Sequence, residues 1–123
     1  MKYLCLIYQD EDAVNSLPPG EWRELIKECD SHTESLIRDQ HFLDGNALAS
    51  VHTATTIKVR QNKVFTTDGP FAETKEQLAG YCLLDARDLN EAIQLASKLP
   101  PIRYGSVEVR PVREDLYDRS AYR

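Results

Sequence analysis

Apolar side chains fall on both alternating sides of two short segments, residues 2–8 and 78–85. In the first segment the two sides are Tyr3, Cys5 and Ile7 against Leu4, Leu6 and Tyr8. A strand that is apolar on both sides is covered on both faces of its sheet. The pattern therefore predicts that these two segments are the central strands of one sheet.

Two other segments show the spacing of amphipathic helices. In residues 21–40 the apolar stripe consists of Trp22, Leu25, Ile26, Cys29, Thr33, Leu36 and Ile37. A turn region that contains Pro18, Pro19 and Gly20 precedes this helix. The second helix begins after Asp88, which has Glu91 three residues later in a variant of the capping box, and ends before Pro100.

The remaining segments are predicted to form shorter strands. Residues 41–51 predict a short or bulged strand, because Gly45-Asn46 interrupts the pattern. Residues 54–60 and 63–67 alternate as two strands of a hairpin, joined by Gln61-Asn62 as a two-residue turn. The last strand covers residues 106–112.

The order of elements is strand–helix–strand, a hairpin, and strand–helix–strand. It predicts an α+β fold, a ferredoxin-like split βαβ sandwich with an inserted β-hairpin and both helices on one sheet face. We expect one domain over residues 1–113 and a charged C-terminal tail over residues 114–123. The tail is either a frayed terminus or a segment that Tyr117 and Tyr122 attach to a partner subunit.

Two helices can cover only one face of this sheet. The other face is partly apolar, so burying it would stabilise an assembly by about 25 cal/mol per Å². A second copy is the simplest cover, and we expect a homodimer packed sheet to sheet. The inserted hairpin folding over that face within one chain is the alternative.

Composition narrows the possible partners and the compartment. The chain has 123 residues and a net charge of −5, and its Lys and Arg residues form no cluster along the sequence, which argues against a nucleic-acid partner. The apolar run of residues 3–8 is too short for a secretion signal and no segment reaches membrane-spanning length. Cys5, Cys29 and Cys82 are scattered, as is typical of reduced core thiols, so we expect a cytoplasmic protein without a membrane partner.

A long motif follows the predicted hairpin: Thr67-Asp68-Gly69-Pro70-Phe71-Ala72-Glu73-Thr74-Lys75-Glu76-Gln77. It resembles the signature of the DGPF branch of the YCII-related family, and agreement extends over about residues 1–113. The resemblance implies a dimeric α+β barrel of the ferredoxin-like kind and a bacterial origin. It also implies a gene neighbourhood shared with extracytoplasmic-function sigma factors, and it implies no known reaction.

The resemblance to the wider family also implies a His–Asp pair in a cleft between helix and sheet. By register these two positions hold Asp30 and Leu99 in this sequence. His32 is two residues from the helix position, about 200° around the helix, so we expect it to point elsewhere. We therefore do not expect the acid–base pair of the family in this chain.

Five residues are candidates for a functional site. Asp68 begins the motif loop and is either a general acid or base or a turn residue whose carboxylate accepts backbone N–H groups. Phe71 is interpreted as a lid over apolar surface, and Tyr81 either faces the cleft or belongs to the core. Arg103, beside Tyr104, either binds a carboxylate or phosphate with its planar guanidinium group or forms a surface ion pair.

Metal and cofactor sites are not indicated. His32, His41 and His52 lack the spacing of metal ligands on one element, and no phosphate-binding or dinucleotide-binding glycine motif occurs. We therefore expect neither a metal nor a cofactor.

Two hypotheses of function remain. The first is a module that binds a small anionic or polar metabolite in a cleft near Asp68 and Arg103, with Tyr81, Tyr104 and Phe71 as further contacts. It would act as a regulatory module linked to a sigma factor. The alternative is a cofactor-independent lyase, isomerase or hydrolase with Asp68 as general acid or base.

Overall fold

The structure is a computed structural model that describes residues 1–122. Its strands are β1 (Lys2–Gln9), β2 (Phe42–Ala47), β3 (Thr55–Arg60), β4 (Lys63–Asp68), β5 (Gln77–Asp85) and β6 (Gly105–Pro111). Its α-helices are α1 (Glu11–Asn15), α2 (Pro19–Arg38) and α3 (Leu89–Ala96), and its 3₁₀-helices are η1 (Val51–Thr53), η2 (Pro100–Tyr104) and η3 (Arg119–Tyr122). Within the described residues no helix is both long and apolar enough to cross a membrane.

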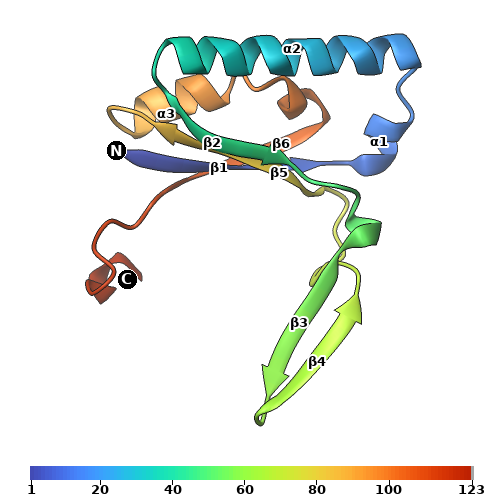
Figure 1. Ribbon diagram of the computed structural model, residues 1–123, viewed down its shortest axis with the longest axis vertical. Coiled ribbons are helices and arrows are strands. Elements are labelled where there is room, and N and C mark those ends of the chain that lie inside the picture. The colour runs from blue at the N-terminus through green and yellow to red at the C-terminus, as the bar shows by residue number, and fades with distance from the viewer. Residues whose placement is uncertain (123) are drawn as a thin grey trace.

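The main sheet has four strands in the order β2-β5-β1-β6, and all neighbours are antiparallel. This is the strand order of a ferredoxin-like sheet, with β1 and β5 at its centre as the apolar patterns predict. Helices α2 and α3 lie on one face of the sheet, while β3 and β4 form a separate two-stranded sheet (Figure 1). The expectation of an α+β fold with an inserted hairpin is confirmed.

The core lies between the sheet and the helices. Cys5 and Leu84, one on each central strand, are completely buried, and Leu36 of α2 packs into the same cluster. The register places Cys5 directly opposite Cys82, and both thiols are free. The buried cysteines therefore act as small apolar side chains in the centre of the sheet.

The start of α3 agrees with the sequence pattern, whereas the pattern does not predict a helix at the position of α1. The Asp88 carboxylate accepts the backbone N–H of Glu91 at 2.9 Å, and the Glu91 carboxylate accepts the N–H of Arg87 at 2.9 Å. Helix α1 lies where only a turn region was predicted. Asp10 caps it by accepting the N–H groups of Asp12 and Ala13.

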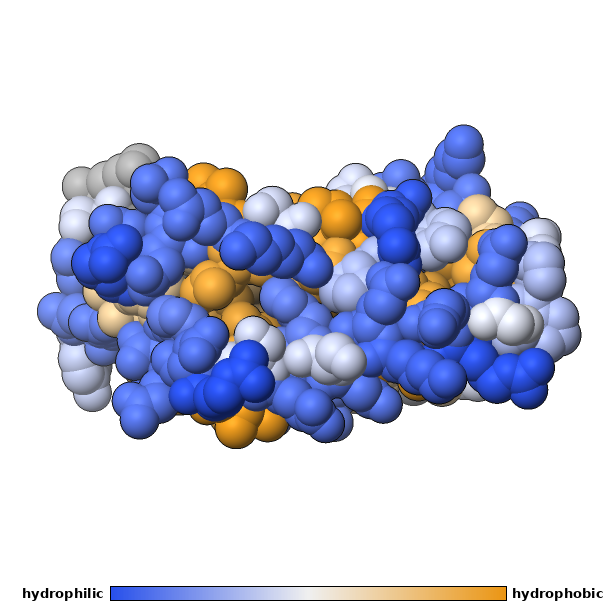
Figure 2. Space-filling view, turned by 90° about the horizontal axis from the view of Figure 1, so that it is seen from above, coloured by the Kyte–Doolittle hydropathy of each residue, from blue (hydrophilic) through white to orange (hydrophobic). Residues whose placement is uncertain are grey.

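The helix layer does not close completely over its sheet face. A groove of about 260 Å³ opens beside α3, with Ile93, Ile102 and Val107 among its lining residues. Figure 2 looks down on this layer and shows hydrophobic residues at the surface between hydrophilic ones.

The hairpin points away from the domain. Gln61 and Asn62 have φ values of 51° and 62°, which agree with the predicted two-residue turn between β3 and β4. Figure 1 shows the hairpin projecting from the side of the sheet opposite to the helices. The alternative in which the hairpin covers the open sheet face of its own chain is therefore wrong.

Two glycines give a matched pair of substitutions. A Cβ on Gly105 would lie 1.9 Å from the carbonyl oxygen of Tyr8, whereas a Cβ on Gly20 would meet no atom within 4 Å. We predict that Gly105→Ala destabilises the protein by more than about 2 kcal/mol, because β6 must move away from β1. Gly20→Ala is expected to stabilise it by about 0.5 kcal/mol. Gly20 lies in α2, where alanine fits the backbone without strain, and alanine reduces the conformational entropy of the unfolded chain. Urea denaturation of both variants would test the pair, and equal effects would contradict the prediction.

Candidate functional site

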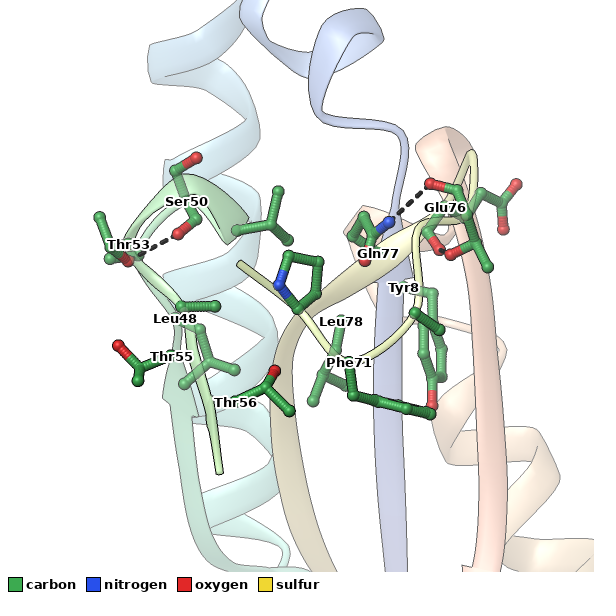
Figure 3. A pocket seen from close by; sticks show the side chains of 16 residues that line it. Tyr8, Leu48, Ser50, Thr53, Thr55, Thr56, Phe71, Glu76, Gln77 and Leu78 are labelled. Atoms are coloured by element: carbon green, nitrogen blue, oxygen red, sulfur yellow. Dashed lines mark hydrogen bonds between the residues drawn. The ribbon is translucent and has the colours of Figure 1, made fainter. Parts of the chain in front are cut away.

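A pocket of about 650 Å³ lies where the hairpin joins the main sheet. One wall is formed by the segment of residues 48–56 and the other by residues 70–78, and Tyr8 of β1 also lines the pocket. Figure 3 shows Leu48 and Thr55 on one side of this pocket and Tyr8, Glu76 and Gln77 on the other. The pocket therefore joins the motif loop to the segment that leads into β3.

The floor of the pocket depends on an irregularity in the central strand pair. Ile7 lies opposite Gly80 but the next residue, Tyr8, lies opposite Leu78, so Ala79 is an extra residue on β5. A bulge of this kind moves all following side chains to the other face of the strand. Tyr8 and Leu78 consequently face the same side, and both line the pocket.

Helix α1 holds the first wall. The carboxylate of Glu11 accepts the backbone N–H of Val51 at 2.8 Å and the hydroxyl of Ser50 at 2.9 Å. The hydroxyl of Ser50 in turn accepts the N–H of His52 at the start of η1. One carboxylate thus orders a loop that would otherwise satisfy its polar groups with water.

The second wall is tied to the base of the hairpin. The N–H of Gly69 donates to the carbonyl of Ala54 at 2.7 Å, and the hydroxyl of Thr56 donates to the carbonyl of Gly69 at 2.8 Å. Gly69 has a φ of 104°, a conformation that favours glycine, so it allows the chain to turn from β4 into the loop. Further along the loop, the side-chain amide of Gln77 donates to the carbonyl of Thr74 at 2.7 Å.

The lining of the pocket is mainly apolar and carries little charge. Among the described residues that line it, Glu76 is the one charged side chain. Its carboxylate accepts the hydroxyl of Ser106 on β6 at 2.7 Å. The other polar groups belong to Ser, Thr, Tyr and Gln side chains, which bind uncharged polar groups.

The structure places the predicted site residues in several different locations. Phe71 lines the pocket, and its side chain is 84 % exposed. Asp68 is exposed at the end of β4 and is not part of the lining. Tyr81 lies on the open face of the sheet, where its hydroxyl accepts the amide of Asn46 at 3.0 Å.

Arg103 and Tyr104 lie in η2, on the helix side of the domain. The guanidinium of Arg103 forms an ion pair with Glu28 of α2 at 2.6 Å and lies 6.0 Å from the centre of the Tyr104 ring. The hairpin that carries Asp68 is on the opposite side (Figure 1). The structure therefore does not bring Asp68 and Arg103 into one cleft.

The positions of the acid–base pair implied by the family resemblance do not hold such a pair. Leu99 is buried, and Asp30 is exposed on α2. The Nε2 atom of His32 is buried without a hydrogen-bond partner in the described part of the chain. Burial, and secondarily the charge of Lys98, lowers the pKa of His32, which is thereby kept neutral near pH 7.

Sequence reasoning missed Glu11, Glu76 and Thr56 as parts of the site. Glu76 belongs to the motif already recognised, but nothing in the spacing shows which motif residue faces a pocket. Glu11 lies in a helix that was not predicted, and its partners are 40 residues away in sequence. Only the fold reveals these contacts.

We predict that Glu11→Ala loosens the first pocket wall. Loss of the Glu11 carboxylate leaves the N–H of Val51 without its acceptor, so the Val51 amide should exchange with solvent at least about tenfold faster. Hydrogen exchange measured by NMR would test this. Glu34→Ala, on the exposed face of α2, is the matched control. Unchanged exchange at Val51 would contradict the anchoring role of Glu11.

Comparison with known proteins identifies the family of the chain. The model of the YCII-related domain family matches residues 1–115 of this chain. An uncharacterized protein of Rhizobium meliloti (strain 1021) is 31% identical to it over 114 residues, which cover 91% of this chain and 92% of that protein. Assignment to the DGPF branch stays a prediction from the motif. The chain belongs to the YCII-related domain family.

Proposed function

We propose that this YCII-related protein binds a small molecule in the pocket beside the motif loop. The observation that supports this most directly is the pocket itself, whose volume of about 650 Å³ falls within the range of small-molecule sites. Its walls are held by hydrogen bonds from Glu11 and Thr56, so the site is largely formed before a ligand enters. A pre-formed site loses little conformational entropy on binding.

The lining favours a particular kind of ligand. An anion in the pocket would face the carboxylate of Glu76 and would meet no cation among the described lining residues. An uncharged ligand with an apolar ring or chain would instead contact Tyr8, Leu48 and Leu78, with hydroxyl groups available for one or two hydrogen bonds. We therefore propose an uncharged or cationic, mainly apolar ligand rather than an anion bound by Arg103.

Binding is favoured over the alternative of a cofactor-independent enzyme. A general acid or base must reach its substrate, and Asp68 is exposed and outside the pocket lining. A regulatory role together with an extracytoplasmic-function sigma factor stays a prediction from the family resemblance.

We predict that Phe71→Ala weakens ligand binding about tenfold while it changes the free energy of unfolding by less than about 0.5 kcal/mol, because the ring is exposed in the free protein. The test is a thermal-shift screen of uncharged aromatic compounds, aromatic amines and aromatic carboxylates, followed by calorimetry on the compounds that bind.

Trp22→Ala is the matched control, since Trp22 is a partly exposed aromatic residue of α2 that does not line the pocket. Binding of carboxylates alone, or equal losses of affinity in both variants, would contradict the proposed site.

We also propose that the protein acts as a homodimer that covers the open sheet face. The residues of β1 and β5 that point away from the helices and do not line the pocket are Leu4, Leu6, Tyr81 and Leu83. The edge strands add polar side chains beside them, since Glu108 lies opposite Leu6 and Arg110 lies opposite Leu4. An apolar centre with a polar rim is typical of an interface.

We predict that the protein elutes as a dimer at micromolar concentration and that Leu6→Lys shifts it to monomer. A lysine at position 6 lies opposite Glu108 in the free chain and is tolerated there, but it places a charge in the centre of the interface. Light scattering coupled to size-exclusion chromatography would measure this.

Leu89→Lys, on the helix side, should leave the dimer intact. A wild-type protein that is monomeric at these concentrations would overturn the dimer.

A further inference from the structure

Two segments project away from the main sheet and its helices. The hairpin β3–β4 and the chain after β6 both extend on the side away from the helices, and Figure 1 shows their ends far from each other within one chain. A two-stranded hairpin is marginally stable in water when nothing packs against it. Each segment therefore presents a surface to a partner.

The hairpin has one cationic face. Its register places Lys58 opposite Phe65 and Arg60 opposite Lys63, so these four side chains share a face. All are exposed, and no ion pair within the described residues engages the three cations. The other face of the hairpin carries Ile57, Val59 and Val64 in its centre. The strand register thus brings together on one face three cations that are separated along the sequence.

Residues 114–118 of the tail carry negative charge, opposite to the charge of this hairpin face. Glu114, Asp115 and Asp118 surround Leu116 and Tyr117, which are 66 % and 97 % exposed. Hydrogen bonds from Ser120 lower the pKa of Asp118, so this carboxylate stays charged at neutral pH. Residues 114–118 thus carry three negative charges and an exposed aromatic ring, with Arg113 and Arg119 on either side, and the hairpin face carries three positive charges and an exposed aromatic ring. The side chain of Tyr122 lies outside the part of the chain whose side chains are described.

We propose that, in the homodimer, the cationic face of one copy's hairpin binds the acidic tail segment of the second copy, residues 114–118. This inference rests on the proposed homodimer. The strands of the hairpin are about 20 Å long, which is long enough to extend beyond its own sheet and alongside a second copy packed on the open face. Opposite charge, aromatic pairing and projection to the same side of the sheet all identify the second copy as the partner.

This contact has a consequence for the pocket. Thr55 and Thr56 at the base of the hairpin line it, and the Thr56 hydroxyl also donates to the carbonyl of Gly69, the residue that precedes the second wall. A tail that holds the hairpin therefore also holds both walls of the pocket. The second copy completes the environment of the site without entering it.

A charge-swap experiment tests the proposal in the full-length chain. One variant carries Lys58→Glu, Arg60→Glu and Lys63→Glu, and the other carries Glu114→Lys, Asp115→Lys and Asp118→Lys. Each variant alone places like charges at both contacts of its dimer, so we expect its dimer dissociation constant to rise about tenfold at low salt. In a one-to-one mixture, the heterodimer has opposite charges at both contacts, and we expect it to form with near wild-type affinity.

Mixing separates a contact between chains from one within a chain, because a contact within one chain cannot be rescued by a second variant. Circular dichroism of each variant checks that the exposed substitutions leave the fold intact. Phe65→Ser and Tyr117→Ser should weaken the dimer by similar factors, and their combination should cost less than the two effects added.

Three outcomes would contradict the hairpin–tail contact, and they can be told apart. A wild-type dimer whose affinity is unchanged in both charge variants would overturn the hairpin–tail contact and leave the homodimer standing. A hairpin variant that weakens the dimer without rescue by the tail variant would also overturn it, since the cations would then bind elsewhere on the partner. A wild-type monomer would overturn the homodimer and this contact together.

Discussion

The apolar character of two central strands on both faces is the constraint on which the rest of this molecule depends. Side chains of β1 and β5 are apolar on either side, and two helices can shield only the side that carries Cys5 and Leu84. The other side presents Leu4, Leu6 and Leu83 from adjacent strands. Exposure of such a surface is unfavourable in water, and the proposed homodimer would bury it.

The same strand pair also creates the site. A single extra residue, Ala79, reverses the direction of the side chains at one end of β5 and brings Leu78 beside Tyr8. The hairpin inserted between β2 and β5 then places residues 48–56 and 70–78 on the two sides of this apolar floor. The pocket is therefore a product of the insertion and the bulge together, and neither alone would enclose it.

The sequence could predict the elements and their order because each depends on local pattern. Apolar alternation in residues 2–8 and 78–85, the cap at Asp88 and the turn at Gln61-Asn62 all appear in the structure where expected. The candidate site was harder to predict because its members meet only through the tertiary fold. Phe71 lines the pocket as part of a recognisable motif, whereas Arg103 is held by Glu28 on the far side of the sheet, a contact across 75 residues that no spacing rule reveals. Glu11 was missed for a similar reason, since a five-residue helix capped by Asp10 leaves no periodic pattern.

If a second copy holds the hairpin through its tail, ligand binding and association become linked. Thr56 connects the hairpin to the motif loop through Gly69, so any order imposed on the hairpin also orders the pocket wall. A ligand that packs against Phe71 and Leu48 would in turn stabilise the base of the hairpin and favour the associated state. Linkage requires the two effects to be equal, so each bound ligand must strengthen the dimer by the same factor by which dimerisation strengthens ligand binding at that site. A small protein without a catalytic pair at the positions implied by its family could by this route convert the concentration of a metabolite into a change of assembly.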